Sequence, residues 1–229
     1  MTVLATPAFL NRVKSIFPAR SVSNPWFIMT AVVFSAANLP EEVPRVFAYA
    51  MEDVQTDQEK IALARKFREA LFKSGLTSGY PKVINSLKAL NDTMPEGLRE
   101  KKVLRNVNLS LEEYGKIGKR AFTDLYGSTA QSVQSLLDDI YPDMGWFSNT
   151  IGYGLTYTLT DVLSPLETSY MLVASLITVD TPQQIIWHLA NARRAGASLE
   201  EVRAVREIAM EVGRCAGIEW RNEVPEVLE

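Results

Sequence analysis

The residues best suited to chemistry lie in the segment TPQQIIWHLANARRAG, which spans residues 181–196. Its histidine, His188, is the only histidine in the 229 residues. Because an imidazole titrates near neutral pH, His188 is a candidate general acid or base for proton transfer. Gln184 precedes it by one helical turn, so on a helix its amide shares a face with His188 and could orient a substrate or the imidazole. The alternative is that His188 is a hydrogen-bonded residue of a helical core, without catalytic function.

The other reactive side chains give weaker signals. The single cysteine, Cys215, excludes an intrachain disulfide and a two-thiol redox centre, and we interpret it as a small buried hydrophobic residue. Asp138, Asp139 and Asp143 form an acidic cluster without a histidine, which is typical of a solvated helix end. We therefore expect no metal site. No glycine-rich phosphate loop follows a strand, so we also expect no nucleotide or other cofactor.

The local sequence signals predict helices throughout. Four serine or threonine residues are followed three positions later by glutamate or glutamine, a pattern that caps helix starts. These pairs are Ser110 with Glu113, Ser164 with Glu167, Thr181 with Gln184, and Ser198 with Glu201. Gly196 follows two arginines and is typical of a helix end. The segment YGLTYTLT at 153–160 has strand propensity, but we interpret it as a helix or helix end because its surroundings are helical. The prediction is an all-α protein.

Composition limits the partners. The chain is 47% hydrophobic and 22% charged, as expected of a folded globular protein. A net charge of −3 argues against a nucleic-acid partner, because phosphate binding requires clustered lysine and arginine. The most apolar stretch, residues 25–40, is too short to span a bilayer and predicts a buried helix. A small-molecule ligand or substrate and protein partners remain.

The terminal regions bear on localisation. The single cysteine fits a reducing, intracellular compartment, and we expect a cytoplasmic protein. The basic first 25 residues faintly resemble a mitochondrial presequence, but Leu10, Val13 and Phe17 also form one face of an amphipathic first helix. The C-terminal tripeptide Val-Leu-Glu is not a peroxisomal targeting signal. Mitochondrial and peroxisomal locations are kept as alternatives.

The chain also contains an internal similarity. Segment 27–50 aligns with 169–192, placing Pro40 over Pro182, and segment 68–80 aligns with 206–218. Two helical units, about 25–90 and 165–220, are therefore expected. Because a two-helix unit cannot build a dry core alone, we expect the units to bury their apolar faces on each other within a single domain, 1–229. An even split into two domains is the alternative.

Residues 163–205, LSPLETSYMLVASLITVDTPQQIIWHLANARRAGASLEEVRAV, resemble the carboxymuconolactone decarboxylase and alkylhydroperoxidase D superfamily. Supporting motifs are RAFTDLYG at 120–127, YPD at 141–143, YG at 153–154 and GYPKVINSLKAL at 79–90. The resemblance implies an alkylhydroperoxidase D-like helical fold that assembles into homo-oligomers: dimers, trimers or hexamers. It also implies either dithiol peroxidase chemistry or decarboxylation of a lactone without cysteines.

The resemblance also places the site residues. It makes His188 the catalytic histidine, puts the two family cysteines on Thr181 and Gln184, and puts the family glutamate on Ser169. Without thiols, dithiol peroxidase activity is not expected. A slip of two residues would move the glutamate position to Glu167. Tyr153 lies in a family-like Tyr-Gly pair, and its phenol could donate into a pocket.

Three functions follow as hypotheses. The first is a cofactor-free lyase that acts on a small organic acid or lactone through proton transfer at His188, with Gln184, Thr181, Ser169 and Tyr153 contacting the substrate. The second is a catalytically degenerate, oligomeric binding or scaffold protein of the same fold. The third, ranked last, is a thiol peroxidase that uses Cys215 with an external reductant.

Overall fold

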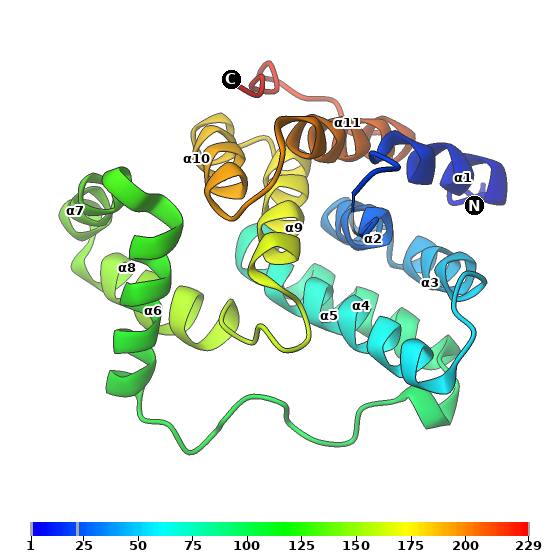
Figure 1. Cartoon of the computed structure of the whole chain (residues 1–229), viewed down its shortest axis with the longest axis horizontal. Helices are drawn as coiled ribbons and strands as arrows, with labels where there is room; N and C mark the ends of the chain where they lie inside the picture. The colour runs from blue at the N-terminus through cyan, green and yellow to red at the C-terminus, as the bar shows by residue number, and fades with distance from the viewer. Residues whose placement is uncertain (1, 22, 229) are drawn as a thin grey trace. The chain divides into compact units, whose positions relative to one another are not determined.

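The computed structural model describes residues 2–21 and 23–228, and its regular structure is helical throughout this range (Figure 1). No β-strand occurs in the described residues, which confirms the all-α prediction. The chain forms two compact units, Met1–Arg99 with Leu166–Glu229, and Glu100–Pro165. Both predicted repeat segments fall in the first unit, apart from residue 165 itself.

The first unit contains most of the helices. They are α1 (Pro7–Ile16), α2 (Trp26–Ala36), α3 (Val43–Met51), α4 (Asp57–Ser78), α5 (Tyr80–Thr93), α9 (Pro165–Thr178), α10 (Pro182–Arg194) and α11 (Leu199–Cys215), with short 3-10 turns at Pro40–Glu42 and Glu96–Leu98. The prediction that Gly196 follows a helix end is confirmed, because α10 ends at Arg194 and Gly196 has a φ of 103°, which glycine adopts readily.

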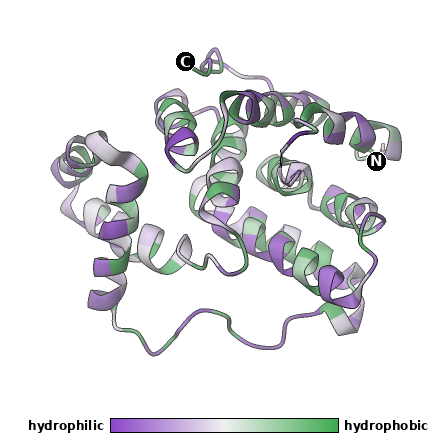
Figure 2. Ribbon diagram, viewed as in Figure 1, coloured by the Kyte–Doolittle hydropathy of each residue, from purple (hydrophilic) through white to green (hydrophobic). Residues whose placement is uncertain are grey.

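Helix α2 is the apolar centre of this unit. Ten of its eleven residues are buried and none is charged, as expected of a helix covered on all sides. The buried-helix prediction for 25–40 is thus confirmed. Around α2 lie amphipathic helices, and Figure 2 shows hydrophobic and hydrophilic residues alternating along α4 and α11. In α1, Leu10 and Val13 are buried, which confirms the predicted amphipathic first helix.

The packing of the first unit joins distant parts of the sequence. Helix α11 packs on α2, although about 170 residues separate them. Helix α4 is tied to α9 by polar bonds, including one from Lys73 Nζ to Thr168 Oγ1 at 3.0 Å. The core therefore requires both ends of the chain.

Capping boxes start three of the long helices. Those at Ser110 and Ser198 confirm the sequence prediction, since each hydroxyl accepts from the amide three residues later and the glutamate side chain accepts from the cap residue. A third box, Thr56 with Glu59, begins α4. It was not predicted, although its sequence has the same spacing as the predicted pairs.

The second unit holds α6 (Leu111–Tyr126), α7 (Ala130–Ile140), α8 (Pro142–Phe147) and a π-helix, η4 (Ser148–Thr156). The prediction of helix or helix end for 153–160 is confirmed, because residues 153–156 lie in η4. Glycines let η4 approach α6 closely: a Cβ on Gly118 would lie 1.7 Å from the Asn149 carbonyl oxygen, and one on Gly154 would lie 2.2 Å from that of Tyr114. In the described residues no helix combines the length and hydrophobicity needed to cross a bilayer.

Candidate functional site

The candidate site is centred on α10, which begins at Pro182 after a sharp turn. The predicted capping box of Thr181 and Gln184 is wrong, because the Thr181 hydroxyl makes no cap hydrogen bond. It donates instead to the Leu176 carbonyl, 3.3 Å away. Thr181 has a ψ of 78°, whereas the capping residues Ser110 and Ser198 have extended ψ values near 160°, which aim the side chain at the helix amides.

The imidazole of His188 is buried, with 6% of the residue exposed. Burial lowers the pKa of His188 to about 4, because removal from water penalises the charged imidazolium. At neutral pH the side chain is therefore the neutral imidazole, with one nitrogen able to accept a proton. Gln184 is exposed, so the structure does not bury the amide that was predicted to orient the imidazole.

A second polar side chain is buried on the same face of α10. Asn191 follows His188 by three residues, a spacing that makes them neighbours on a helix, and it is 0% exposed. Its Oδ1 accepts from Arg194 Nη1 at 2.9 Å. Its Nδ2 makes no hydrogen bond with any described residue. Asn191 was not among the predicted site residues.

The preceding helix, α9, contains two of the residues weighed for the family glutamate. Ser169 is buried at 1% exposure and has no titratable group. Glu167 is 8% exposed, and its carboxylate accepts from the Lys66 ammonium of α4. A carboxylate thus exists near the predicted position, but it is engaged in an ion pair.

Helix α4 also places charged side chains against α9. Lys73 is fully buried, 3.0 Å from Thr168 Oγ1 and 3.8 Å from the Glu69 carboxylate. A buried ammonium is rare unless it is paired, since desolvation costs several kcal/mol. The sequence reasoning missed Lys66, Glu69 and Lys73. The Glu69 and Lys73 spacing of four residues is the same as that of a surface ion pair, so only tertiary packing reveals the burial.

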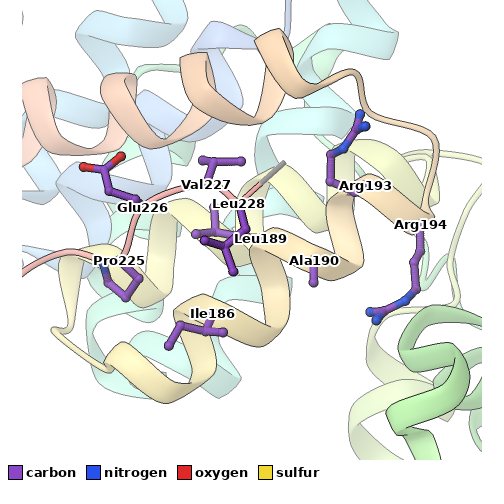
Figure 3. A pocket seen from close by; sticks show the side chains of 9 residues that line it. All are labelled: Ile186, Leu189, Ala190, Arg193, Arg194, Pro225, Glu226, Val227 and Leu228. Carbon is purple, nitrogen blue, oxygen red and sulfur yellow. The ribbon is translucent and has the colours of Figure 1, made fainter.

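The pocket on the other side of α10 is distinct from the His188 face. Ile186 and Ala190 each lie two residues from His188, a spacing that puts side chains on different helix faces. With Leu189, Arg193, Arg194 and residues 225–228 they line a pocket of about 560 Å³ (Figure 3). The C-terminal segment is held there by Arg206, which donates to the carbonyl oxygens of residues 224 and 225 at 2.8 Å. This pocket therefore does not present the imidazole.

The predicted substrate residue Tyr153 belongs to the second unit. Its hydroxyl donates to that of Tyr126 at 3.2 Å, and its ring lies edge-on to Phe122 and Tyr157. Burial, together with the neighbouring phenol of Tyr126, raises the pKa of Tyr153 well above that of a free phenol. Tyr153 is thus a neutral member of an aromatic cluster.

The remaining candidates have structural surroundings. Cys215 packs against the first-unit core, and burial and the carboxylates of Glu211 and Glu42 raise the pKa of its thiol. That shift disfavours the thiolate on which peroxidase chemistry depends. Asp138, Asp139 and Asp143 are exposed, and Asp138 accepts from Gln134 at 2.8 Å. Within the described residues no group of three potential ligands is arranged for a metal ion.

Comparison with known proteins identifies relatives along almost the whole chain. No family model matches, and no solved structure matches. "Peroxisomal protein 2" of Schizosaccharomyces pombe is 31% identical over 198 residues, which cover 86% of this chain and 90% of that protein. "Peroxisomal protein 2" of Saccharomyces cerevisiae is 24% identical over 261 residues, with 89% of this chain and 92% of that protein covered. With this identity and coverage, the chain belongs to the Peroxisomal protein 2 family.

Proposed function

We propose that the chain is a cofactor-free, carboxymuconolactone decarboxylase-like lyase that acts on a small organic acid or lactone through proton transfer at His188. The observation that supports this proposal most is the buried, neutral imidazole beside the buried amide of Asn191. The two side chains supply a proton-accepting nitrogen and an N–H donor on one helix face. The superfamily resemblance of residues 163–205 supports the same reading.

The chemistry needs one proton from solvent in each turnover. The bond between the substrate carboxylate and its neighbouring carbon breaks, CO₂ leaves, and the electron pair passes to a carbonyl oxygen to give an enolate. An anionic substrate beside the imidazole raises the pKa of His188 from about 4, so binding brings proton uptake. The imidazolium then donates this proton to the carbon, and product release returns His188 to its neutral form.

The test is CO₂ release from a panel of carboxylated lactones and β-keto acids. We expect turnover by the wild type and a loss of about 100-fold or more in His188→Gln, the size typical of a lost general acid or base. The exposed Gln183 of the same helix gives a control, Gln183→Ala, which should retain full turnover. Equal rates in wild type and His188→Gln would remove His188 from the mechanism.

A second candidate is a catalytically degenerate, oligomeric binding or scaffold protein. It is favoured by the exposed Gln184, whose amide lies at the surface, and by Glu167, whose carboxylate already accepts from the Lys66 ammonium. This candidate predicts no turnover across the panel, together with a stable oligomer in light scattering. A strict monomer would contradict both the scaffold and the assembly implied by the resemblance.

We also propose that the protein resides in the peroxisome, which replaces the cytoplasm as the favoured location. The support is that both relatives are named as peroxisomal proteins. An N-terminal fluorescent fusion expressed in yeast should coincide with a peroxisomal matrix marker. Diffuse cytoplasmic fluorescence, or coincidence with a mitochondrial marker, would contradict this location.

A further inference from the structure

We infer that Asn191 binds and orients the ligand of the His188 site, by donating from Nδ2 to an acceptor oxygen of a small keto acid or lactone. This inference deepens the proposed function and rests on it for the nature of the ligand. It concerns a residue that is buried completely and lies one helical turn after His188.

The orientation of the Asn191 amide is fixed by Arg194. The guanidinium carries only N–H donors, so the Asn191 atom that lies 2.9 Å from Arg194 Nη1 must be the carbonyl Oδ1. The Nδ2 group consequently points away from Arg194. A flip of the amide would set two donors against each other and leave Oδ1 in the place of Nδ2.

The Nδ2 group has no acceptor among the described residues, although its accessible area is below 1 Å². A buried donor that loses its bond to water and gains none in return destabilises the fold, so such groups are rare and call for an explanation. A ligand oxygen that accepts from Nδ2 provides one. This explanation is independent of the pKa of His188.

The spacing of Asn191 and His188 and the donor at Nδ2 together indicate the class of ligand. Side chains three residues apart on a helix have Cβ atoms about 5–6 Å apart, so one small molecule can contact both Asn191 and His188. Nδ2 requires an acceptor, which is the carbonyl or enolate oxygen of a keto acid or lactone. A donation to the enolate oxygen strengthens as charge develops on it, so Asn191 would favour the decarboxylated intermediate over the substrate.

The equivalent helix in the first predicted repeat offers no such pair. Placing Pro40 over Pro182 puts Val46 at the position of His188 and Tyr49 at that of Asn191. Val46 is buried and has no polar side-chain atom, whereas Tyr49 is only partly buried and packs its ring against Trp26. The aligned helix α3 therefore lacks the buried polar pair of α10.

The test compares acetoacetate with butyrate, which lacks the keto oxygen, in calorimetric binding to the full chain. We expect the wild type to bind acetoacetate roughly tenfold more tightly than butyrate, as one hydrogen bond to a desolvated donor provides. Asn191→Leu should bind both equally. It should also unfold at the same or higher urea concentration, because the variant removes the unsatisfied donor.

A second variant guards against a folding defect. Asn191→Asp keeps an oxygen for Arg194 and replaces the N–H donor by a carboxylate oxygen, so it should lose acetoacetate binding at neutral pH, with circular dichroism checking that the variant is folded. The side-chain amide signal of Asn191, assigned by its absence in Asn191→Leu, should shift in NMR spectra with acetoacetate and not with butyrate. A wild type that does not discriminate, or an Asn191→Leu variant that still does, would overturn the inference.

The two proposals fail in different ways. If His188→Gln keeps the preference for acetoacetate, and neither the wild type nor any variant releases CO₂, Asn191 orients a ligand but the lyase proposal is wrong. If CO₂ release depends on His188 while Asn191→Leu leaves both turnover and the acetoacetate preference intact, the lyase proposal stands and the inference about Asn191 is wrong.

Discussion

Two helix–turn–helix segments of the first unit have turns of the same geometry but bury different kinds of side chain. In α2 and α3 the turn contains Asn38, with a φ of 58°, and in α9 and α10 it contains Asp180, with a φ of 57°. Placing Pro40 over Pro182 superimposes these two residues in the sequence. The hydrogen bonds of the two turns correspond as well. The Leu39 amide donates to the Phe34 carbonyl, and the Thr181 amide donates to the Leu176 carbonyl. The third helices, α4 and α11, both begin with capping boxes, at Thr56 and Ser198, which the same alignment pairs.

The second helices of the two segments differ. In the first, Glu42 is buried and accepts from the amides of Leu4 and Ala5 and from Arg45. The aligned residue of the second, Gln184, is exposed. The first segment thus anchors the N-terminal chain, and the second carries a buried histidine and amide. One backbone frame serves packing in one place and a polar site in the other, although the duplication itself stays a prediction.

The largest effect is expected from the anchor of the first segment. Glu42→Leu leaves two backbone amides without their acceptor, so we expect a loss of about 4 kcal/mol in the free energy of unfolding. The matched change, Gln184→Leu, should alter it by less than about 0.5 kcal/mol, because Gln184 is exposed. Urea denaturation measures both. Similar losses in the two variants would contradict the difference between the segments.

The next effect is a pH dependence of the free energy of unfolding, which His188 contributes and its aligned residue, Val46, does not. The folded pKa of about 4 lies below the ordinary value of 6.5, so between these values the unfolded chain binds a proton that the folded protein excludes. Stability should therefore fall by up to about 3 kcal/mol as the pH drops from 6.5 to 4.

In the His188→Gln variant this contribution to the pH dependence should vanish, whereas other acid-sensitive groups remain. The measurement is the difference between the wild-type and variant urea midpoints at pH 7 and at pH 4.5. A difference that does not change with pH would show that His188 titrates normally in the folded protein.

A smaller effect tests the helix starts. Thr56→Ala and Ser198→Ala each remove a capping hydroxyl, at an expected cost of about 1 kcal/mol. Thr181→Ala should cost less than about 0.5 kcal/mol, because its hydroxyl bonds only the Leu176 carbonyl at 3.3 Å. Thermal unfolding compares the three variants. A loss of stability in Thr181→Ala as large as in the other two variants would show that Thr181 does cap α10.

The smallest effect concerns the two turns. Asn38→Gly should stabilise the protein by about 0.5 kcal/mol, since glycine adopts a positive φ more easily than asparagine does and the bond lost, from Asn85 Nδ2 at 3.4 Å, is long and exposed. Asp180→Gly should not stabilise it, because the Asp180 carboxylate accepts from the Arg221 amide at 2.8 Å and from Asn222. A gain in both variants would mean that these tail contacts contribute nothing.

The sequence predicted features that depend on near neighbours. The caps at Ser110 and Ser198 and the stop at Gly196 require only local geometry, so local patterns were sufficient. The box at Thr181 was wrong because the preceding turn fixes its backbone at a ψ of 78° and presents the Leu176 carbonyl to its hydroxyl. A local motif fails where the turn before it sets the geometry.

The candidate site was predicted only in part. His188 could be found by its chemistry and by the superfamily resemblance, but the burial of Asn191 and the exposure of Gln184 depend on which side of α10 is covered. Likewise, Glu69 and Lys73 have the spacing of an exposed ion pair and become buried only because α4 packs against α2 and bonds to α9. Long-range packing decides these positions, and a single sequence does not contain it in readable form.

The packing of early helices against late ones has a consequence for protein synthesis. Helix α2 packs on α11, and Lys73 bonds to Thr168, both of which are synthesised much later. A nascent chain that has emerged only as far as α5 therefore exposes α2, its most apolar helix, and the Lys73 ammonium, which is buried in the folded protein. Translation must therefore complete α11, the last helix of the described residues, before this unit can close. Until then, the exposed apolar surface of α2 is open to aggregation.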